Sequence, residues 1–117
     1  EKVYFIVRSP IFLKSMKVDA KGSGYLRAKI YTDDGTLVVE AYNDEITDGE
    51  EMLSFNHILP IGTYYLTHDG NTELGFNDNF VGYPIKSNGL IELTGTEYQN
   101  NSYYMYYYEW EYSVIPD

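Results

Sequence analysis

Residues 24–42 read GYLRAKIYTDDGTLVVEAY, and this stretch decides the fold class. Its apolar residues alternate with polar and charged residues on both sides of a central Asp-Asp-Gly turn signal. A period of two residues is typical of a half-buried β-strand, and two such runs joined by a short Gly-containing turn predict a hairpin. We therefore expect a β-hairpin across residues 24–42.

The same alternation continues through most of the chain, and no window shows a helical period. Turn and loop residues separate the runs. The predicted segments are strands at 52–59 and 64–68, a long loop at 77–89, a short strand at 91–93, a polar turn at 95–102 and a long final strand at 103–114. Short antiparallel strands at this spacing predict an all-β fold, an antiparallel β-sandwich of the jelly-roll type.

The composition sets limits on the class of protein. The 117 residues are 44% hydrophobic and 22% charged, which predicts one globular domain over residues 1–117. The net charge of −10 disfavours binding to nucleic acid, and the short apolar runs predict no membrane insertion. With no cysteine, thiol catalysis and cysteine-bound metals are excluded. Because residue 1 is Glu, we expect the chain to be a piece of a larger parent protein or a processed product.

The final predicted strand carries the strongest functional signal, because ten successive positions from Tyr103 to Tyr112 hold seven tyrosine or tryptophan residues. A strand separates them into two faces. Carboxylates avoid a dry core, so the face with Glu109 and Glu111 should be in water and Trp110 should point inward. Exposed aromatic rings beside carboxylates suit saccharide binding. The predicted binding residues here are Tyr103, Tyr107, Glu109 and Glu111; alternatively, the tyrosines simply suit an exposed strand.

The predicted loop at 77–89 supplies further candidates. Its first half places short amide and carboxyl side chains beside aromatic ones, an arrangement that can hydrogen-bond a ligand and stack on it. The candidates are Asn77, Asp78, Asn79 and Tyr83. The alternative is turn chemistry, since Asn, Asp and Gly also occur where the backbone needs unusual dihedrals.

Metal binding and catalysis have weaker signals, and we expect no cofactor. A weak calcium hypothesis rests on five acidic residues within eight positions, although such a cluster is more often a solvated loop: Asp44, Glu45, Asp48, Glu50 and Glu51. Glu109 and Glu111 could act as the carboxylate pair of a glycoside hydrolase, but one strand carries both. His57 shares the apolar side of its strand and is expected in the interior, whereas His68 has no partner spacing for a metal.

Several segments together resemble a known group of accessory domains. They are LKSMKV at 13–18 followed by Gly22 and Gly24, LPIGTYYL at 59–66, Tyr83-Pro84, GLIELTG at 89–95 and YYYEWE at 106–111. The chain resembles the carbohydrate-binding-module-like β-sandwiches of phage tail and receptor-binding proteins and of bacterial surface proteins. The resemblance implies an extracellular place on a virion tail or a bacterial surface. It also implies adhesion to cell-wall or cell-surface polysaccharide, through Tyr83, Tyr107, Glu109 and Trp110.

These observations rank three classes of function. A non-catalytic carbohydrate-binding module comes first, because aromatic residues are abundant where the strand alternation leaves them in water. A structural or protein-docking module of a tail or surface assembly comes second, since Tyr, Trp and Met also form protein interfaces. An enzyme comes last, so we expect no catalytic activity.

Overall fold

The structure is a computed structural model, and it describes residues 2–74, 76–77, 85–87, 89–96, 104–105 and 108–115. The described residues form strands and turns without a helix. The strands are β1 (Val3–Val7), β2 (Ile11–Lys21), β3 (Gly24–Thr32), β4 (Leu37–Ile46), β5 (Gly49–Leu59), β6 (Gly62–Gly70), β7 (Glu73–Leu74), β8 (Phe76–Asn77), β9 (Ile85–Ser87), β10 (Ile91–Thr96), β11 (Tyr104–Met105) and β12 (Tyr108–Val114). No helix in the described part of the chain is long and apolar enough to cross a membrane.

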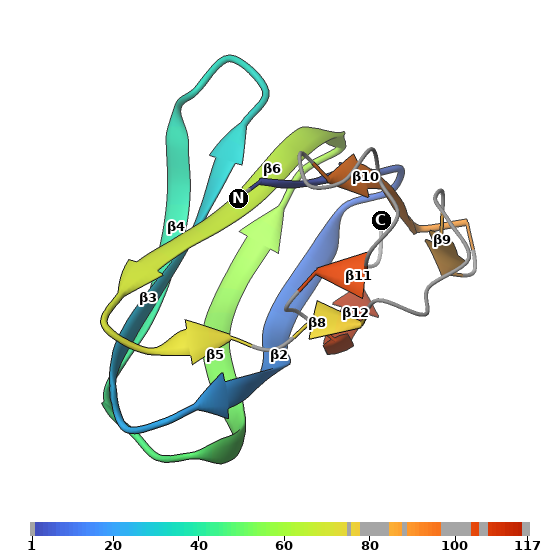
Figure 1. The fold of residues 1–117 in the computed structure, drawn as a ribbon. Coiled ribbons are helices and arrows are strands. Elements are labelled where there is room, and N and C mark those ends of the chain that lie inside the picture. Colours follow the sequence, from blue (N-terminus) through green and yellow to red (C-terminus); the bar gives the residue numbers. More distant parts are fainter. Residues whose placement is uncertain are drawn as a thin grey trace.

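Two antiparallel sheets make up the body of the molecule (Figure 1). A six-stranded sheet has the order β4-β3-β6-β1-β10-β9, and a four-stranded sheet has the order β12-β2-β5 with β7 also paired to β2. A further small pair joins β11 to β8. The chain passes from one large sheet to the other between β1 and β2, β2 and β3, β4 and β5, and β5 and β6. The predicted all-β sandwich is confirmed, and the jelly-roll subtype stays a prediction.

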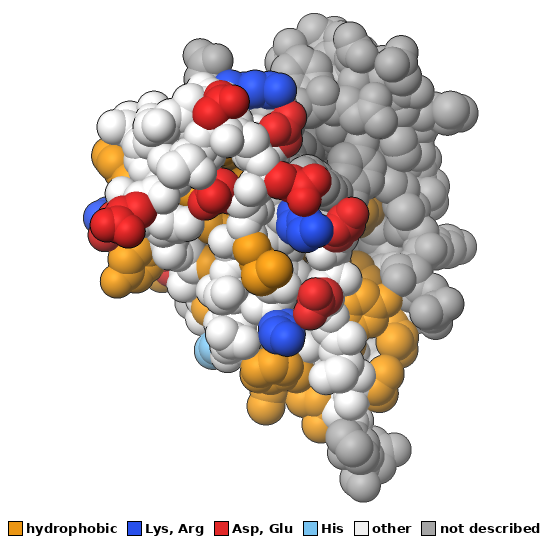
Figure 2. All heavy atoms as spheres, turned by 90° about the horizontal axis from the view of Figure 1, so that it is seen from below, with side chains coloured by type: hydrophobic (Ala, Val, Ile, Leu, Met, Phe, Trp, Pro, Cys, Tyr) orange, Lys and Arg blue, Asp and Glu red, His pale blue; other side chains and the backbone are white. Residues whose placement is uncertain are grey.

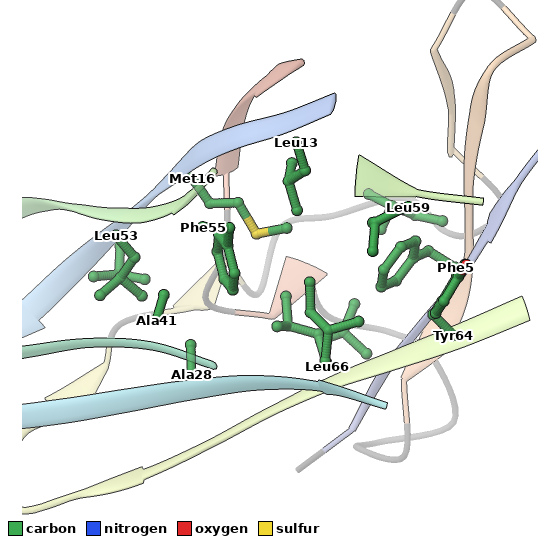
Figure 3. Close-up of a cluster of buried hydrophobic side chains, with 14 of the residues drawn as sticks. Phe5, Leu13, Met16, Ala28, Ala41, Leu53, Phe55, Leu59, Tyr64 and Leu66 are labelled. Carbon is green, nitrogen blue, oxygen red and sulfur yellow. The ribbon is translucent and has the colours of Figure 1, made fainter. Parts of the chain in front are cut away.

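The core lies between the two sheets. In Figure 3, side chains of the four-stranded sheet such as Leu13, Met16 and Leu53 point toward Ala28 and Leu66 of the six-stranded sheet. Each of these residues is almost completely buried. The apolar positions that alternate along each strand therefore face one another across the sandwich, as binary patterning requires.

The hairpin predicted at residues 24–42 is present as β3 and β4. The strands pair antiparallel around the turn after Thr32, where the Asp34 carboxylate accepts hydrogen bonds from the Thr32 hydroxyl and the Thr36 backbone N–H. These hydrogen bonds lower the pKa of Asp34, the bond from Thr32 most of all. Gly35 takes the positive φ of 92° that closes the turn.

Two sequence predictions about loops and strands are wrong. The predicted loop at 77–89 contains β9, which pairs with β10 because Gly89, at a φ of 71°, allows a tight turn between them. The single final strand predicted from Tyr103 to Val114 does not keep one partner, because among its described residues β11 pairs with β8 while β12 pairs with β2. A tyrosine-rich sequence suits either pairing and carries no turn signal, so the sequence did not indicate the change of partner.

Bulges interrupt the four-stranded sheet at one level. Between Leu13 and Ser15 of β2, the partner strand β5 contains one extra residue, and Asn56 in that bulge has a φ of 48°. On the other side of β2, strand β12 contains one extra residue between Tyr108 and Glu111, and Glu109 there has a φ of 47°. Bulges increase the local twist and change the direction in which side chains point. As a result, the simple alternation of the sequence does not hold through this part of the sheet.

Candidate functional site

Five of the eight predicted binding residues lie outside the described part of the chain: Asp78, Asn79, Tyr83, Tyr103 and Tyr107. Asn77 belongs to β8, where its backbone is opposite Tyr104 of β11. The structure therefore places only Glu109 and Glu111 as side chains, and the predictions for the other residues stay predictions.

The polarity predicted for the end of the final strand is confirmed from Glu109 to Tyr112. Glu109 and Glu111 are exposed, whereas Trp110 and Tyr112 pack against the core. The Trp110 ring meets the buried Phe5 ring edge to face, with 5.1 Å between the ring centres. Trp110 therefore packs against the hydrophobic core from its edge, as the alternation predicts.

Glu109 and Glu111 belong to an ion-pair cluster on the outer face of the four-stranded sheet. The Lys17 Nζ atom lies 2.7 Å from Glu109 and 3.3 Å from Glu50, and the Lys14 Nζ atom lies 3.6 Å from Glu111. Glu109, and after it Glu50, raises the pKa of the Lys17 ammonium. Figure 2 shows basic side chains in blue directly against acidic side chains in red. Because separate lysines hold the two carboxylates, this arrangement favours a solvated charged surface over a hydrolase pair.

The acidic stretch from the end of β4 to the start of β5 has a partly paired carboxylate within the chain. The Glu51 carboxylate accepts hydrogen bonds from Asn43 and Thr47, each at 3.2 Å. In the described residues, no three His, Asp or Glu side chains are gathered into a group that could hold a metal ion. The calcium hypothesis therefore gains no support from the arrangement of these carboxylates.

The two histidines lie in opposite environments. The prediction that His57 is interior is wrong: its side chain is exposed although it is opposite the buried Leu13, because β5 is the edge strand of its sheet. His68 is on the inward side of β6, opposite the buried Ala28. Burial lowers the pKa of the His68 imidazole to about 4, so this side chain is neutral at pH 7.

An aromatic row crosses the outer face of the six-stranded sheet. Tyr65 of β6 lies directly opposite Tyr4 of β1 on one side and opposite Tyr31 of β3 on the other. The ring centres of Tyr4 and Tyr65 are 6.1 Å apart, and those of Tyr31 and Tyr65 are 5.1 Å apart. The rings are half-buried, and the residues beside them in sequence, such as Phe5 and Leu66, point into the core. Strand pairing thus gathers three tyrosines that are far apart in sequence.

Two more tyrosines extend this outer surface. Tyr25 is 39% exposed and Tyr42 is 62% exposed, and Arg27 lies between them: its guanidinium is 5.7 Å from the centre of the Tyr25 ring, and its backbone is opposite Tyr42. We call the five residues Tyr4, Tyr25, Tyr31, Tyr42 and Tyr65 the tyrosine face. A protein surface with five tyrosines on one sheet is a candidate binding surface, since tyrosine combines a large apolar ring with a polar hydroxyl.

A charged group adjoins the aromatic row. The Lys29 ammonium lies 2.9 Å from the Asp69 carboxylate and 3.9 Å from Glu40, and Asp69 raises the Lys29 pKa. Lys29 precedes Tyr31 by two residues in β3 and therefore points to the same face. The tyrosines therefore have a hydrogen-bond donor, the Lys29 ammonium, and an acceptor, the Asp69 carboxylate, beside them, and the ion pair orients both groups.

Sequence reasoning missed the tyrosine face for a specific reason. Within each strand the alternation indicates that Tyr4, Tyr31 and Tyr65 point outward, but it says nothing about which strands are neighbours. The pairing of β1 with β6 and of β6 with β3 joins positions up to 61 residues apart in sequence. A comparison of this chain with protein-family models, curated proteins and solved structures finds no match.

Proposed function

We propose that this chain is a non-catalytic saccharide-binding domain and that the tyrosine face is its binding surface. The observation that carries the proposal is the aromatic row of Tyr4, Tyr65 and Tyr31, held in register across three strands. Tyrosines contribute apolar contact to the C–H groups of a sugar and hydroxyls to its polar groups. The Lys29–Asp69 pair beside the row offers a charged donor and a charged acceptor for sugar hydroxyls.

The sequence resemblance supplies the proposed setting. A module of this kind would attach a phage tail or a bacterial surface protein to cell-wall or cell-surface polysaccharide, and it would work outside the cell as part of a larger parent protein. The surface that we propose differs from the one predicted at the final strand, where lysines form ion pairs with Glu109 and Glu111.

Isothermal titration with cell-wall and soluble polysaccharides tests the proposal. Tyr42→Ala and Tyr31→Ala should each weaken binding by about 1 to 3 kcal/mol, the usual range for an aromatic anchor. Met52→Ala is the matched control, because Met52 is 50% exposed on β5, a strand of the other sheet. It should leave affinity unchanged.

The same titrations separate the two surfaces. Loss of binding in Tyr107→Ala or Glu109→Gln, with normal binding in both variants of the tyrosine face, would place the site at the final strand and reject our choice of surface. Turnover of a polysaccharide that disappears in Glu111→Gln would instead make the chain an enzyme.

A protein-docking module is the second candidate. Several large apolar side chains are at least half exposed in the described residues: Leu37, Met52, Ile58, Ile61 and Val114. Such residues suit a protein interface. A flat titration with every glycan, together with a defined oligomer or complex in solution, would favour docking.

A further inference from the structure

The ring geometry of the aromatic row limits how it can meet a ligand. The Tyr31 and Tyr65 rings are nearly parallel, with 16° between their planes and 5.1 Å between their centres. Two rings lying side by side in one plane would need a wider spacing to avoid contact between their edges. The pair is therefore an offset stack, in which each ring covers one face of the other.

Tyr65 is covered from the opposite side as well. The Lys2 ammonium lies 4.7 Å from the centre of the Tyr65 ring, within the range of a cation–π contact. Strand β6 lies between β1 and β3 in the sheet, so Lys2 and Tyr31 approach Tyr65 from opposite sides. The central ring of the row consequently has no open face on which a sugar could stack.

The parts of the rings left for a ligand are their edges and hydroxyls. Side chains on the outer face of a sheet stand roughly perpendicular to it, so the end of each tyrosine, its phenol oxygen, is expected farthest from the strands. A phenol hydroxyl both donates and accepts a hydrogen bond. Three hydroxyls in one row would match a ligand that offers closely spaced hydroxyl groups.

The charges nearby point to an uncharged ligand. Lys29 is already paired with Asp69 and Glu40, and the net charge of −10 repels polyanions. A cationic ligand would seek tyrosine faces, but Lys2 occupies the face of Tyr65 and Arg27 lies over Tyr25. The charged groups beside the tyrosines thus already have contacts within the chain, which favours a ligand without charge.

We propose that the aromatic row recognises a neutral polysaccharide through the phenol hydroxyls of Tyr4, Tyr31 and Tyr65, and not by stacking sugar rings on the aromatic faces. The proposal rests on the proposed saccharide-binding function and specifies its ligand class and contact mode.

Tyrosine-to-phenylalanine variants test this contact mode, because they remove a hydroxyl and keep the ring. Tyr31→Phe and Tyr65→Phe should each lower the affinity for a neutral polysaccharide about threefold to tenfold, the effect of losing one neutral hydrogen bond. Their Tm should equal that of the wild type, since the stack is kept. Tyr64→Phe is the matched control: the ring of Tyr64 is buried, and its hydroxyl donates a partly buried hydrogen bond to the Pro60 carbonyl at 2.6 Å. That variant should lower Tm and leave affinity unchanged.

The outcomes separate the inference from the function on which it rests. If the wild type binds and both phenylalanine variants bind equally well, recognition does not use these hydroxyls, and the inference is wrong while saccharide binding stands. Tighter binding of the wild type to acidic than to neutral polysaccharides would overturn the assignment of ligand class. If the wild type binds no glycan, the proposed function itself fails.

Discussion

Acidification should destabilise this protein through one histidine. His68 lies on the inward side of β6 and is half-buried, and this burial lowers the imidazole pKa from 6.5 to about 4. The unfolded chain therefore binds a proton that the folded chain excludes at any pH between these two values. Protonation of His68 therefore does not reduce the free energy of unfolding above pH 6.5. The free energy of unfolding falls as the pH decreases from 6.5 toward 4, and below pH 4 His68 causes little further change.

The size of the effect follows from the two pKa values. A pKa lowered from 6.5 to about 4 corresponds to at most about 3 kcal/mol of stability. Because the side chain keeps some contact with solvent and Asp69 acts in the opposite direction, we expect a loss of about 1 to 3 kcal/mol across this pH range.

Urea unfolding at a series of pH values measures this loss, with circular dichroism and the fluorescence of the one tryptophan as probes. The chain supplies its own control, since its second histidine, His57, is exposed. His68→Gln should remove most of the loss of stability between pH 7 and pH 5, and His57→Gln should keep it. All three proteins carry the same carboxylates, so the difference in their pH dependence reports on the histidines. If His68→Gln loses stability as steeply as the wild type, the burial of His68 does not carry the pH dependence and our reasoning fails.

Two further predictions concern the packing of the sandwich. Trp110→Ala should lower the free energy of unfolding by about 3 kcal/mol, because the indole packs against the core and meets the Phe5 ring edge to face; a loss below about 1 kcal/mol in urea unfolding would mean that Trp110 is not a core residue. Gly70→Ala should destabilise the protein more than Gly49→Ala. Both glycines have a positive φ, so alanine is strained at either position. A Cβ at Gly70 would also lie 2.3 Å from the Tyr25 carbonyl oxygen, whereas a Cβ at Gly49 would have no atom within 4 Å. Equal Tm values for the two alanine variants would contradict this account.

The strands of this fold were predictable because one face of each strand is buried. In β3 the sequence alternates between core residues and solvent-facing residues without interruption, and the hairpin with β4 was found together with its turn. The alternation of apolar and polar residues follows burial, so it predicts which residues of a strand are buried wherever the strand is regular.

The same reasoning failed where the backbone is irregular. In β5 a bulge lies at Asn56, and the next residue, His57, is exposed on this edge strand although its position in the sequence pattern matches the buried Phe55 and Leu59. In the tyrosine-rich C-terminal region, β11 and β12 have different partner strands, and the types of residue in the sequence do not indicate this difference. The positive φ values at Asn56 and Glu109 arise from the way the strands pair. Neither position is a glycine, so the sequence gives no sign of them.

The candidate site was the least predictable part for a related reason. A site on a single strand can be recognised from sequence. The alternation therefore predicts correctly that Glu109 and Glu111 are exposed. The aromatic row is instead a property of register: moving β6 by one residue against β3 would turn Tyr65 inward and replace it with Tyr64 or Leu66. The buried contacts of Tyr64 and Leu66 therefore hold Tyr65 beside Tyr31, so the core of this sandwich, and not any local motif, determines that the three tyrosines form one surface.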